Sequence, residues 1–212
     1  MISAQNPRSP RRTQRQRREL SQNRMLEAAI TLVARQGSSR TTLSEIGEAA
    51  GYTHGLVSHR FGSKGELIRT LIGELQTHFA KSLLPALAGK QGLSALKLAC
   101  ASYLRAAARS DRHALYVLIG EALGPVPEIR SEIAKADENF RRAIRRQLDH
   151  GIRAGEIRAT VDPATEAALI VAALRGLVIQ RMLNRDSFNL DSVCKAFNSN
   201  LERTLKRPSA EK

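Results

Sequence analysis

The chain has 212 residues, 42% of them hydrophobic and 25% charged, which is ordinary for a globular protein and excludes wholesale disorder. Lysine and arginine outnumber aspartate and glutamate by 34 to 20, so the formal net charge is +14. This excess predicts an anionic partner, either nucleic acid or an anionic membrane surface. The only cysteines, Cys100 and Cys194, have neither a disulfide pattern nor zinc-ligand spacing. We therefore expect no metal, no cofactor and a reducing, cytoplasmic location.

Membrane insertion and secretion are not predicted. The basic N-terminus is followed by an amphipathic segment rather than a continuous apolar one, so it does not read as a signal peptide. The longest apolar window, 164–178, contains Thr165, Glu166 and Arg175. It is too short and too charged to span a bilayer. We expect a protein without membrane contact.

Residues 1–19 are rich in arginine and almost free of apolar side chains, which predicts a disordered basic arm. Residues 1–60 hold ten arginines against four glutamates, so the excess charge is concentrated towards this end. An arm of this kind either stays nonspecific or reaches into a minor groove. Its arginines are Arg8, Arg11, Arg12, Arg15, Arg17 and Arg18.

The first predicted helix starts at Leu20. Leu26, Ala29, Ile30 and Val33 recur at the spacing of one helix face, and Gly37 is placed to end the helix.

A second and a third helix follow at short distance. Thr42 and Glu45 have the spacing of a capping box, which predicts a helix start, and Gly51 ends that helix. The third helix runs from Thr53 to Phe61. Two short helices joined by a glycine turn predict a helix-turn-helix.

The third helix carries short or hydrogen-bonding side chains on its outward face. Ala49 and Ala50 are small, so we expect the two short helices to cross closely there. Gly55 occupies a helical position where alanine would be more stable by about 1 kcal/mol, and close approach of a base is one reason for it. The outward residues are Thr53, His54, Gly55, Ser58 and His59.

The rest of the chain also has helical periodicity. A second capping box at Ser63 and Glu66 opens a fourth helix towards Pro85. No strand pattern of useful length occurs, so the expected fold is all-α with about nine helices. The later helices are expected near 93–110, 112–123, 128–155, 163–183 and 190–205.

Residues 20–70 resemble the DNA-binding domain of the TetR family of one-component transcriptional regulators. The stretch that carries the resemblance, 51–67, reads Gly-Tyr-Thr-His-Gly-Leu-Val-Ser-His-Arg-Phe-Gly-Ser-Lys-Gly-Glu-Leu. Within it, 55–61 is similar to the subset that contains the choline-responsive repressor of betaine synthesis. The resemblance implies a third helix in the major groove, a C-terminal inducer pocket, and a homodimer formed by the last two helices. It divides the chain into arm 1–19, DNA-binding domain 20–66, regulatory and dimerisation domain 67–207 and tail 208–212.

By position, the resemblance implies base-edge and groove contacts for Thr53, His54 and Gly55, and phosphate contacts for Ser58 and His59. Thr42 and Lys64, at helix N-termini, would also bind phosphate. This chain departs from the family with Ser58 where many members have tyrosine, and Arg60 where tyrosine or histidine is common. Other interpretations remain open: Thr42 and Ser63 as helix caps alone, Lys64 as a solvated lysine, and either histidine paired with a glutamate.

Small residues predict close helix packing across a two-fold axis. The helix at 163–183 is rich in them, and the helix at 190–205 offers an apolar face, so we expect a four-helix dimer interface. The alternative is that these faces belong to the core of one chain. The residues concerned are Ala164, Ala167, Ala168, Ala172, Ala173 and Gly176, then Val193, Phe197, Leu201 and Leu205.

Polar and aromatic residues on otherwise apolar helices mark where a ligand could bind. With eight aromatic residues and no tryptophan, an aromatic cage for a quaternary ammonium is not favoured. The candidate ligand-binding residues are Tyr103, His113, Tyr116, Glu121, Phe140 and Arg175.

No nucleophile–base arrangement, phosphate loop or metal motif occurs, so we expect no enzyme. The leading hypothesis is a homodimeric transcriptional regulator that binds a double-stranded DNA operator and an unidentified small-molecule inducer, most simply a repressor. The alternative is a nonspecific or architectural nucleic-acid-binding protein that acts through its basic arm.

Overall fold

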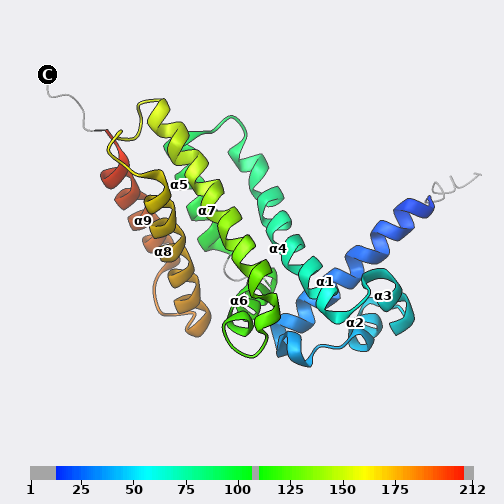
Figure 1. The fold of residues 1–212 in the computed structure, drawn as a ribbon. Coiled ribbons are helices and arrows are strands. Elements are labelled where there is room, and N and C mark those ends of the chain that lie inside the picture. The colour runs from blue at the N-terminus through cyan, green and yellow to red at the C-terminus, as the bar shows by residue number, and fades with distance from the viewer. Residues whose placement is uncertain (1–12, 107–109, 208–212) are drawn as a thin grey trace, which may run out of the picture.

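The computed structural model describes residues 13–106 and 110–207. Within these ranges the chain forms nine α-helices and one short 3-10 turn, with an isolated bridge between Ile157 and Lys206, so the all-α prediction is confirmed. Figure 1 shows α1, α2 and α3 at one end and α5, α8 and α9 at the other. The elements are α1 (Gln14–Arg40), α2 (Leu43–Ala50), α3 (His54–Phe61), α4 (Lys64–Leu87), α5 (Gly92–Arg105), α6 (Ser110–Leu123), η2 (Pro127–Ile129), α7 (Arg130–Arg153), α8 (Pro163–Leu183) and α9 (Leu190–Leu205).

The first helix begins earlier than the sequence predicted. Thr13 and Gln16 form a capping box, so α1 starts at Gln14 instead of Leu20. An ion pair of 2.9 Å between Arg15 and Glu19 supports this first part of the helix. The expectation of a disordered arm over all of 1–19 is therefore wrong for residues 14–19. The rest of that expectation, and the proposed tail at 208–212, lie outside the described residues.

Helix α1 also breaks at the glycine that was expected to end it. Gly37 has φ +83° and ψ 163°, outside the helical range, and helical structure resumes as far as Arg40. Elsewhere the ends shift by a few residues: α5 ends at Arg105, and α7 begins after η2. The expected continuation of α5 to 110 passes through residues 107–109, which the structure does not describe.

Two hydrophobic clusters hold the helices together. The first joins α1, α2 and α3 to α4, α6 and α7, and includes Met25, Val57 and Leu118, each fully buried. The second joins α5, α7, α8 and α9, and includes Leu96 and Leu174. Because the first cluster runs from the short helices into α6 and α7, it crosses the boundary expected at residues 66 and 67.

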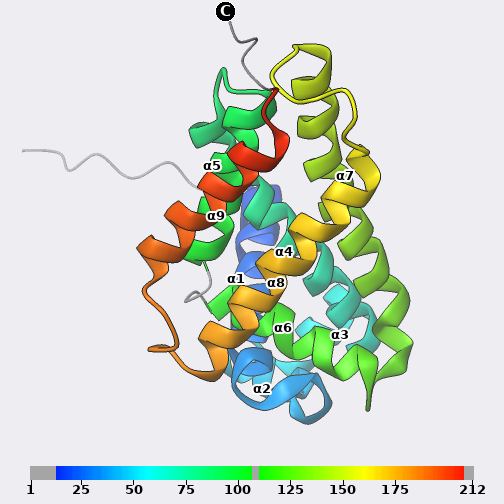
Figure 2. The ribbon, with the colours of Figure 1, turned by 90° about the vertical axis from the view of Figure 1, so that its left-hand side faces the viewer.

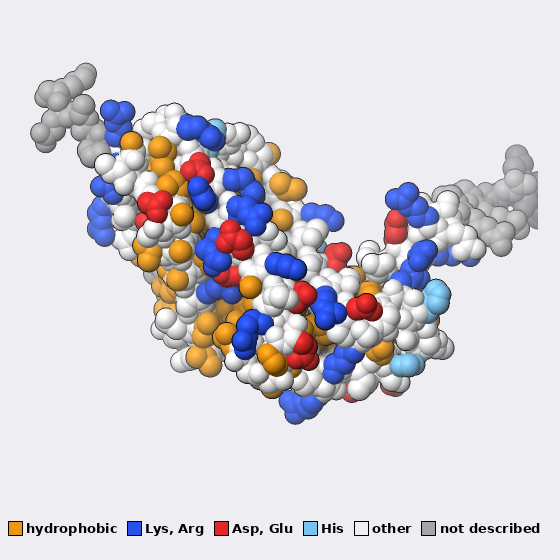
Figure 3. Space-filling view, viewed as in Figure 1, with side chains coloured by type: hydrophobic (Ala, Val, Ile, Leu, Met, Phe, Trp, Pro, Cys, Tyr) orange, Lys and Arg blue, Asp and Glu red, His pale blue; other side chains and the backbone are white. Residues whose placement is uncertain are grey.

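Helices α8 and α9 lie side by side on one face of the molecule (Figure 2). The outer side of α8 exposes Leu169, Ile179 and Leu183 by 59%, 45% and 82% of their surface. Figure 3 shows hydrophobic side chains gathered on the side where these helices lie. The expected contribution of Leu201 and Leu205 to a dimer face is wrong, because both are buried in the core of their own chain. Ala167 is also buried in that core.

Candidate nucleic-acid interface and buried aromatic cluster

Two glycines shape the crossing of α2 and α3: Gly51 forms the turn between them, and Gly47 forms the close contact. Gly51 takes the left-handed conformation, with φ +77°, and ends α2. The Tyr52 amide donates to the Gly47 carbonyl over 2.7 Å, and a Cβ on Gly47 would lie 2.8 Å from the Tyr52 carbonyl oxygen. The close crossing therefore depends on Gly47. Ala49 does not contribute as expected, because it is exposed to solvent, whereas Ala50 is partly buried and packs against the first hydrophobic cluster.

One face of α3 packs inward and the other faces solvent. Val57 and Phe61 are 0% and 8% exposed and join the first hydrophobic cluster. Gly55 and His59 on the opposite face are exposed, and so is His54 in the first turn. A Cβ added to Gly55 would meet no atom within 4 Å. Among the described residues neither histidine has a carboxylate partner, so the alternative of a histidine–glutamate pair does not occur.

The hydroxyl groups near this face take part in local hydrogen bonds. Thr53, the N-cap of α3, is exposed and accepts from the Leu56 amide over 3.3 Å. Ser58 is half-buried, and its hydroxyl donates to the Gly62 carbonyl over 3.3 Å. The short serine side chain therefore remains close to its own helix end.

Thr42 has a complete role as a helix cap. Its hydroxyl donates to the Glu45 carboxylate over 2.9 Å and accepts from the Glu45 amide over 3.2 Å. The pKa of Glu45 lies below its ordinary value because the backbone amide and the hydroxyl of Thr42 both donate to the carboxylate. A phosphate contact of Thr42 would come in addition to this cap.

Lys64 at the start of α4 and Arg60 in α3 both make hydrogen bonds to α1. The Lys64 ammonium donates to the Ser39 carbonyl over 2.7 Å, so Lys64 is more than a solvated lysine. Arg60 turns back to α1, where its guanidinium donates to the Arg18 carbonyl over 3.5 Å and the Ser21 hydroxyl over 3.2 Å. It thus points away from the exposed face of α3. Ser63 caps α4 by accepting from the Glu66 amide.

A hollow of about 800 Å³ opens between the start of α1 and the end of α3. Four of its lining residues are arginines, which makes it a region of positive potential. It is lined by Gln14, Arg15, Arg17, Arg18, Leu20, Ser21, Tyr52 and Arg60.

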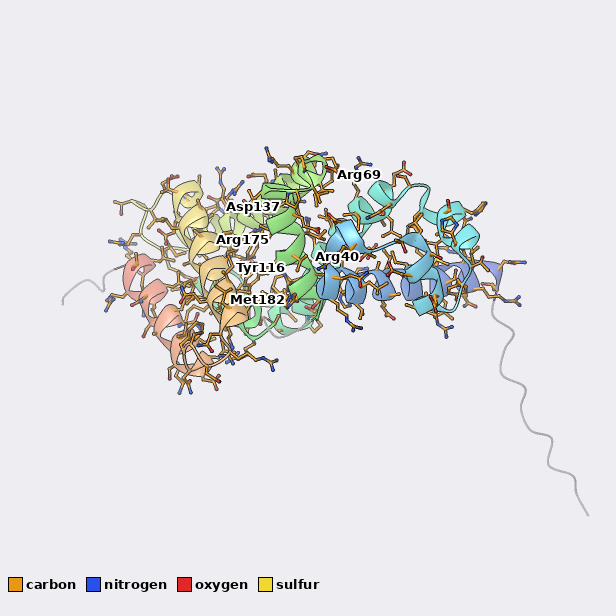
Figure 4. All side chains as sticks on the ribbon, turned by 90° about the horizontal axis from the view of Figure 1, so that it is seen from below. Arg40, Arg69, Tyr116, Asp137, Arg175 and Met182 are labelled. Atoms are coloured by element: carbon orange, nitrogen blue, oxygen red, sulfur yellow. The ribbon has the colours of Figure 1, made fainter. Side chains whose placement is uncertain are left out.

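Four of the six candidate ligand-binding residues meet between α5, α6, α7 and α8. The hydroxyls of Tyr103 and Tyr116 lie 2.9 Å apart, and Tyr103 stacks on Phe140 with ring centroids 4.9 Å apart. Arg175 pairs with Asp137 over 2.7 Å. Figure 4 shows Tyr116, Arg175 and Asp137 near one another. The pKa of Tyr116 lies well above its ordinary value. The main cause is desolvation by burial, and the neighbouring Tyr103 is the second.

Arg112 completes this cluster and was missed in the sequence. It is 4% exposed, and its guanidinium lies 3.9 Å from the ring centroid of Phe79 and 5.2 Å from that of Tyr103. Such contacts stabilise a buried cation over aromatic faces. Its position four residues before Tyr116 puts both on one face of α6, and this spacing could have revealed it.

The other two candidates lie elsewhere, so their assignment to the same ligand site is wrong. His113 is exposed to solvent on α6 and has no contact with the cluster among the described residues. The carboxylate of Glu121 accepts hydrogen bonds from the amides of Ser38 and Ser39 in α1.

The described part of the chain contains no group of three or more histidine, cysteine, aspartate or glutamate side chains that could hold a metal ion. No helix in those residues is long and apolar enough to cross a membrane.

A capped helix, a left-handed glycine turn and a second short helix with an exposed polar face define a helix-turn-helix protein. The chain matches the family described as bacterial regulatory proteins, tetR family, over residues 25–71. It also matches the tetracyclin repressor-like C-terminal domain over residues 92–197. The chain therefore belongs to the TetR family of transcriptional regulators, as the resemblance implied.

Individual relatives agree with this assignment. The chain is 24% identical over 168 residues to the HTH-type transcriptional regulator SrpR of Pseudomonas putida, covering 79% of this chain and 78% of that protein. A TetR-family regulator from Rhodococcus sp. superposes with a TM-score of 0.80 at 16% identity, covering 89% and 100%. NalD, the secondary repressor of the MexAB-OprM multidrug efflux pump in Pseudomonas aeruginosa, gives a TM-score of 0.71 at 19% identity, covering 92% and 100%. The two structures show the likeness of the fold.

Proposed function

We propose that this protein is a homodimeric, sequence-specific repressor that leaves its operator when a small molecule binds the C-terminal domain. The observation that carries the proposal is the exposure of His54, Gly55 and His59 on α3, where neither histidine has a hydrogen-bond or carboxylate partner among the described residues. Side chains of this kind, on a helix held by buried apolar residues, suit the reading of base edges in a major groove. NalD, which shares this fold, is a repressor, and this supports the sign of regulation.

The position of each side chain supports a particular DNA contact. His54 and Gly55 reach base edges, Thr53 lies beside them at the start of α3, and His59 reaches the phosphate backbone. Ser58 adds a short phosphate contact. Thr42 and Lys64 add phosphate contacts at the N-termini of α2 and α4, where helix dipoles favour an anion.

The dimer forms through the outer faces of α8 and α9. The exposed Leu169, Ile179 and Leu183 form an apolar surface on α8 that a second copy would cover. Two recognition helices related by a two-fold axis would then lie about 34–36 Å apart, one turn of DNA.

The inducer binds among Tyr103, Tyr116, Phe140 and Arg175, together with the buried Arg112. Binding favours a conformation in which the two recognition helices no longer match successive grooves. A coupling free energy of about 1–3 kcal/mol would change operator affinity by about 5–150-fold. The residues serve binding, and no arrangement among them suggests a reaction.

A second candidate function is favoured by the arginine-lined hollow beside α1. In that case the protein binds nucleic acid without sequence preference, through its basic N-terminal end. Selection of bound duplexes from a random pool, at one fixed salt concentration, separates the two functions. We expect a two-fold symmetric operator to emerge, both for the full chain and for a variant without residues 1–12. A pool that stays random would refute the proposal and favour the second function.

A further inference from the structure

The last turn of α6 is hydrogen-bonded to the break in α1. The Glu121 carboxylate accepts from the Ser38 amide over 3.1 Å and from the Ser39 amide over 3.3 Å. Hydrogen bonds to an ionised carboxylate are stronger than those between neutral groups. The partners are more than eighty residues apart in the sequence, so this contact connects the regulatory part of the chain to the DNA-binding part.

Local geometry explains why the carboxylate fits there. Where helical structure restarts after Gly37, the first amides have no partner within the helix, and a carboxylate placed there acts as an N-cap. Gly37 leaves the space for it, since a Cβ at that position would lie 2.7 Å from a Glu121 carboxylate oxygen. The Thr41 hydroxyl donates to the Gly37 carbonyl over 2.7 Å and closes the turn.

The same turn sets the position of the helix-turn-helix. It ends at Thr42, the N-cap of α2, and the Lys64 ammonium binds its Ser39 carbonyl from the start of α4. The short segment Ser38–Thr42 is therefore held by Glu121 from one side and Lys64 from another. A change in the first contact would alter the direction in which α2 leaves α1.

Helix α6 also reaches the buried cluster. Arg112 and Tyr116 lie in that cluster, and Glu121 follows Tyr116 by five residues, about 7.5 Å along the helix axis. Ala122, one residue further, is 1% exposed and accepts from the Arg130 guanidinium through its carbonyl over 3.1 Å. A shift of α6 at the cluster would therefore be transmitted directly to Glu121.

We propose that Glu121 is a positioning residue for DNA recognition: its carboxylate holds the α1–α2 turn, and displacement of α6 at the buried cluster releases it. This inference rests on the proposed function, because it assigns the contact through which the ligand site and the DNA-binding unit are coupled. Glu121 itself touches neither ligand nor DNA.

The first test is a double-mutant cycle on operator affinity, with Tyr116→Trp as a permanent perturbation of the cluster. In a chain that keeps Glu121, we expect Tyr116→Trp to weaken operator binding about fivefold or more. In the Glu121→Ala background, the same substitution should change affinity by less than about twofold. Unchanged affinity for Tyr116→Trp alone, or effects that add within about twofold, would refute the coupling.

The second test is amide hydrogen exchange of the free protein, which needs no operator. Glu121→Ala should raise the exchange rates of the Ser38 and Ser39 amides about tenfold or more, while the Thr41 amide, bonded within the turn, keeps its protection. Glu121→Gln keeps an oxygen acceptor and should restore part of the protection. The matched control is Glu128→Gln, an exposed carboxylate with no side-chain hydrogen bond in the described residues.

The outcomes separate the two proposals. If no operator is selected but the Ser38 and Ser39 amides lose protection, the proposed function fails and the contact made by Glu121 stands. If an operator is selected but protection is unchanged in Glu121→Ala, the positioning role of Glu121 is refuted and the proposed function stands.

Discussion

Gly47 and Gly55 sit eight residues apart in the two short helices, and alanine at these positions should have opposite effects. At Gly47 a Cβ would lie 2.8 Å from the Tyr52 carbonyl oxygen and 3.2 Å from the Thr53 carbonyl carbon. Both neighbours are backbone atoms, so α3 as a whole would have to move. At Gly55 a Cβ would meet nothing within 4 Å.

The magnitudes follow from two opposing contributions. Alanine in place of glycine inside a helix is worth up to about 1 kcal/mol of stability. Overpacking costs about 1–3 kcal/mol, and a contact with backbone belongs near the upper end. Gly47→Ala should therefore lower the free energy of unfolding by about 1–2 kcal/mol, or about 2–8 °C in Tm for a chain of this length. Gly55→Ala lies in the first turn of α3 and should raise stability by a few tenths to about 1 kcal/mol.

Urea unfolding would measure the stabilities, at matched protein concentration because the stability of the proposed dimer depends on concentration. Operator titration would measure the effect of each substitution on DNA affinity. The added methyl group at Gly55 faces the proposed groove contact, so Gly55→Ala should weaken operator binding about tenfold although the free protein is more stable. A destabilised Gly55→Ala variant, or a Gly47→Ala variant with wild-type stability and affinity, would refute the packing argument.

Three further substitutions test other parts of the site. Lys64→Ala should weaken binding to all sequences and reduce the slope of log affinity against log salt concentration by about one. His54→Ala should change the preferred sequence instead. A salt slope equal to that of the wild type would show that Lys64 does not contact phosphate. Leu183→Glu, and separately Leu169→Glu, should produce monomers in analytical ultracentrifugation, and dimers of wild-type affinity would contradict the proposed interface. The pKa of Glu45 is lowered in the folded state, so its contribution to stability is present above the ordinary glutamate pKa and is lost as the pH falls through the folded value. Thermal unfolding from pH 6 to 3 should show a smaller loss for Glu45→Gln, and an identical pH dependence would exclude this role.

Much of the fold could be predicted because its helix boundaries are marked locally. Thr42, Gly51 and Ser63 bracket α2, α3 and the start of α4 through capping and turn geometry that depends on few neighbours. The early start of α1 was missed although Thr13 and Gln16 have capping-box spacing, because the surrounding arginines suggested an unfolded segment.

The buried aromatic cluster was predicted only in part, because it depends on which helices meet. Tyr103, Phe140 and Arg175 could be recognised as unusual on apolar helices, but Arg112, which lies over the Tyr103 ring, resembled any surface arginine. Glu121 was singled out as a polar residue on an apolar helix, but as a ligand-binding candidate and not as a contact to α1. Its partner is the broken end of α1, and no local spacing predicts a contact between segments so far apart in the sequence.

The hydrophobic cluster that joins the short helices to α6 limits how this regulator could be divided into modules. A chimaera that received the first 66 residues from another member of the family would place a foreign α1 against Leu118 and Ala122, which are 0% and 1% exposed. The junction would have to be matched along the whole surface of α6, beyond the point where the chain is cut. For this protein the unit of exchange, in evolution or in design, is the DNA-binding helices together with the helix on which they rest.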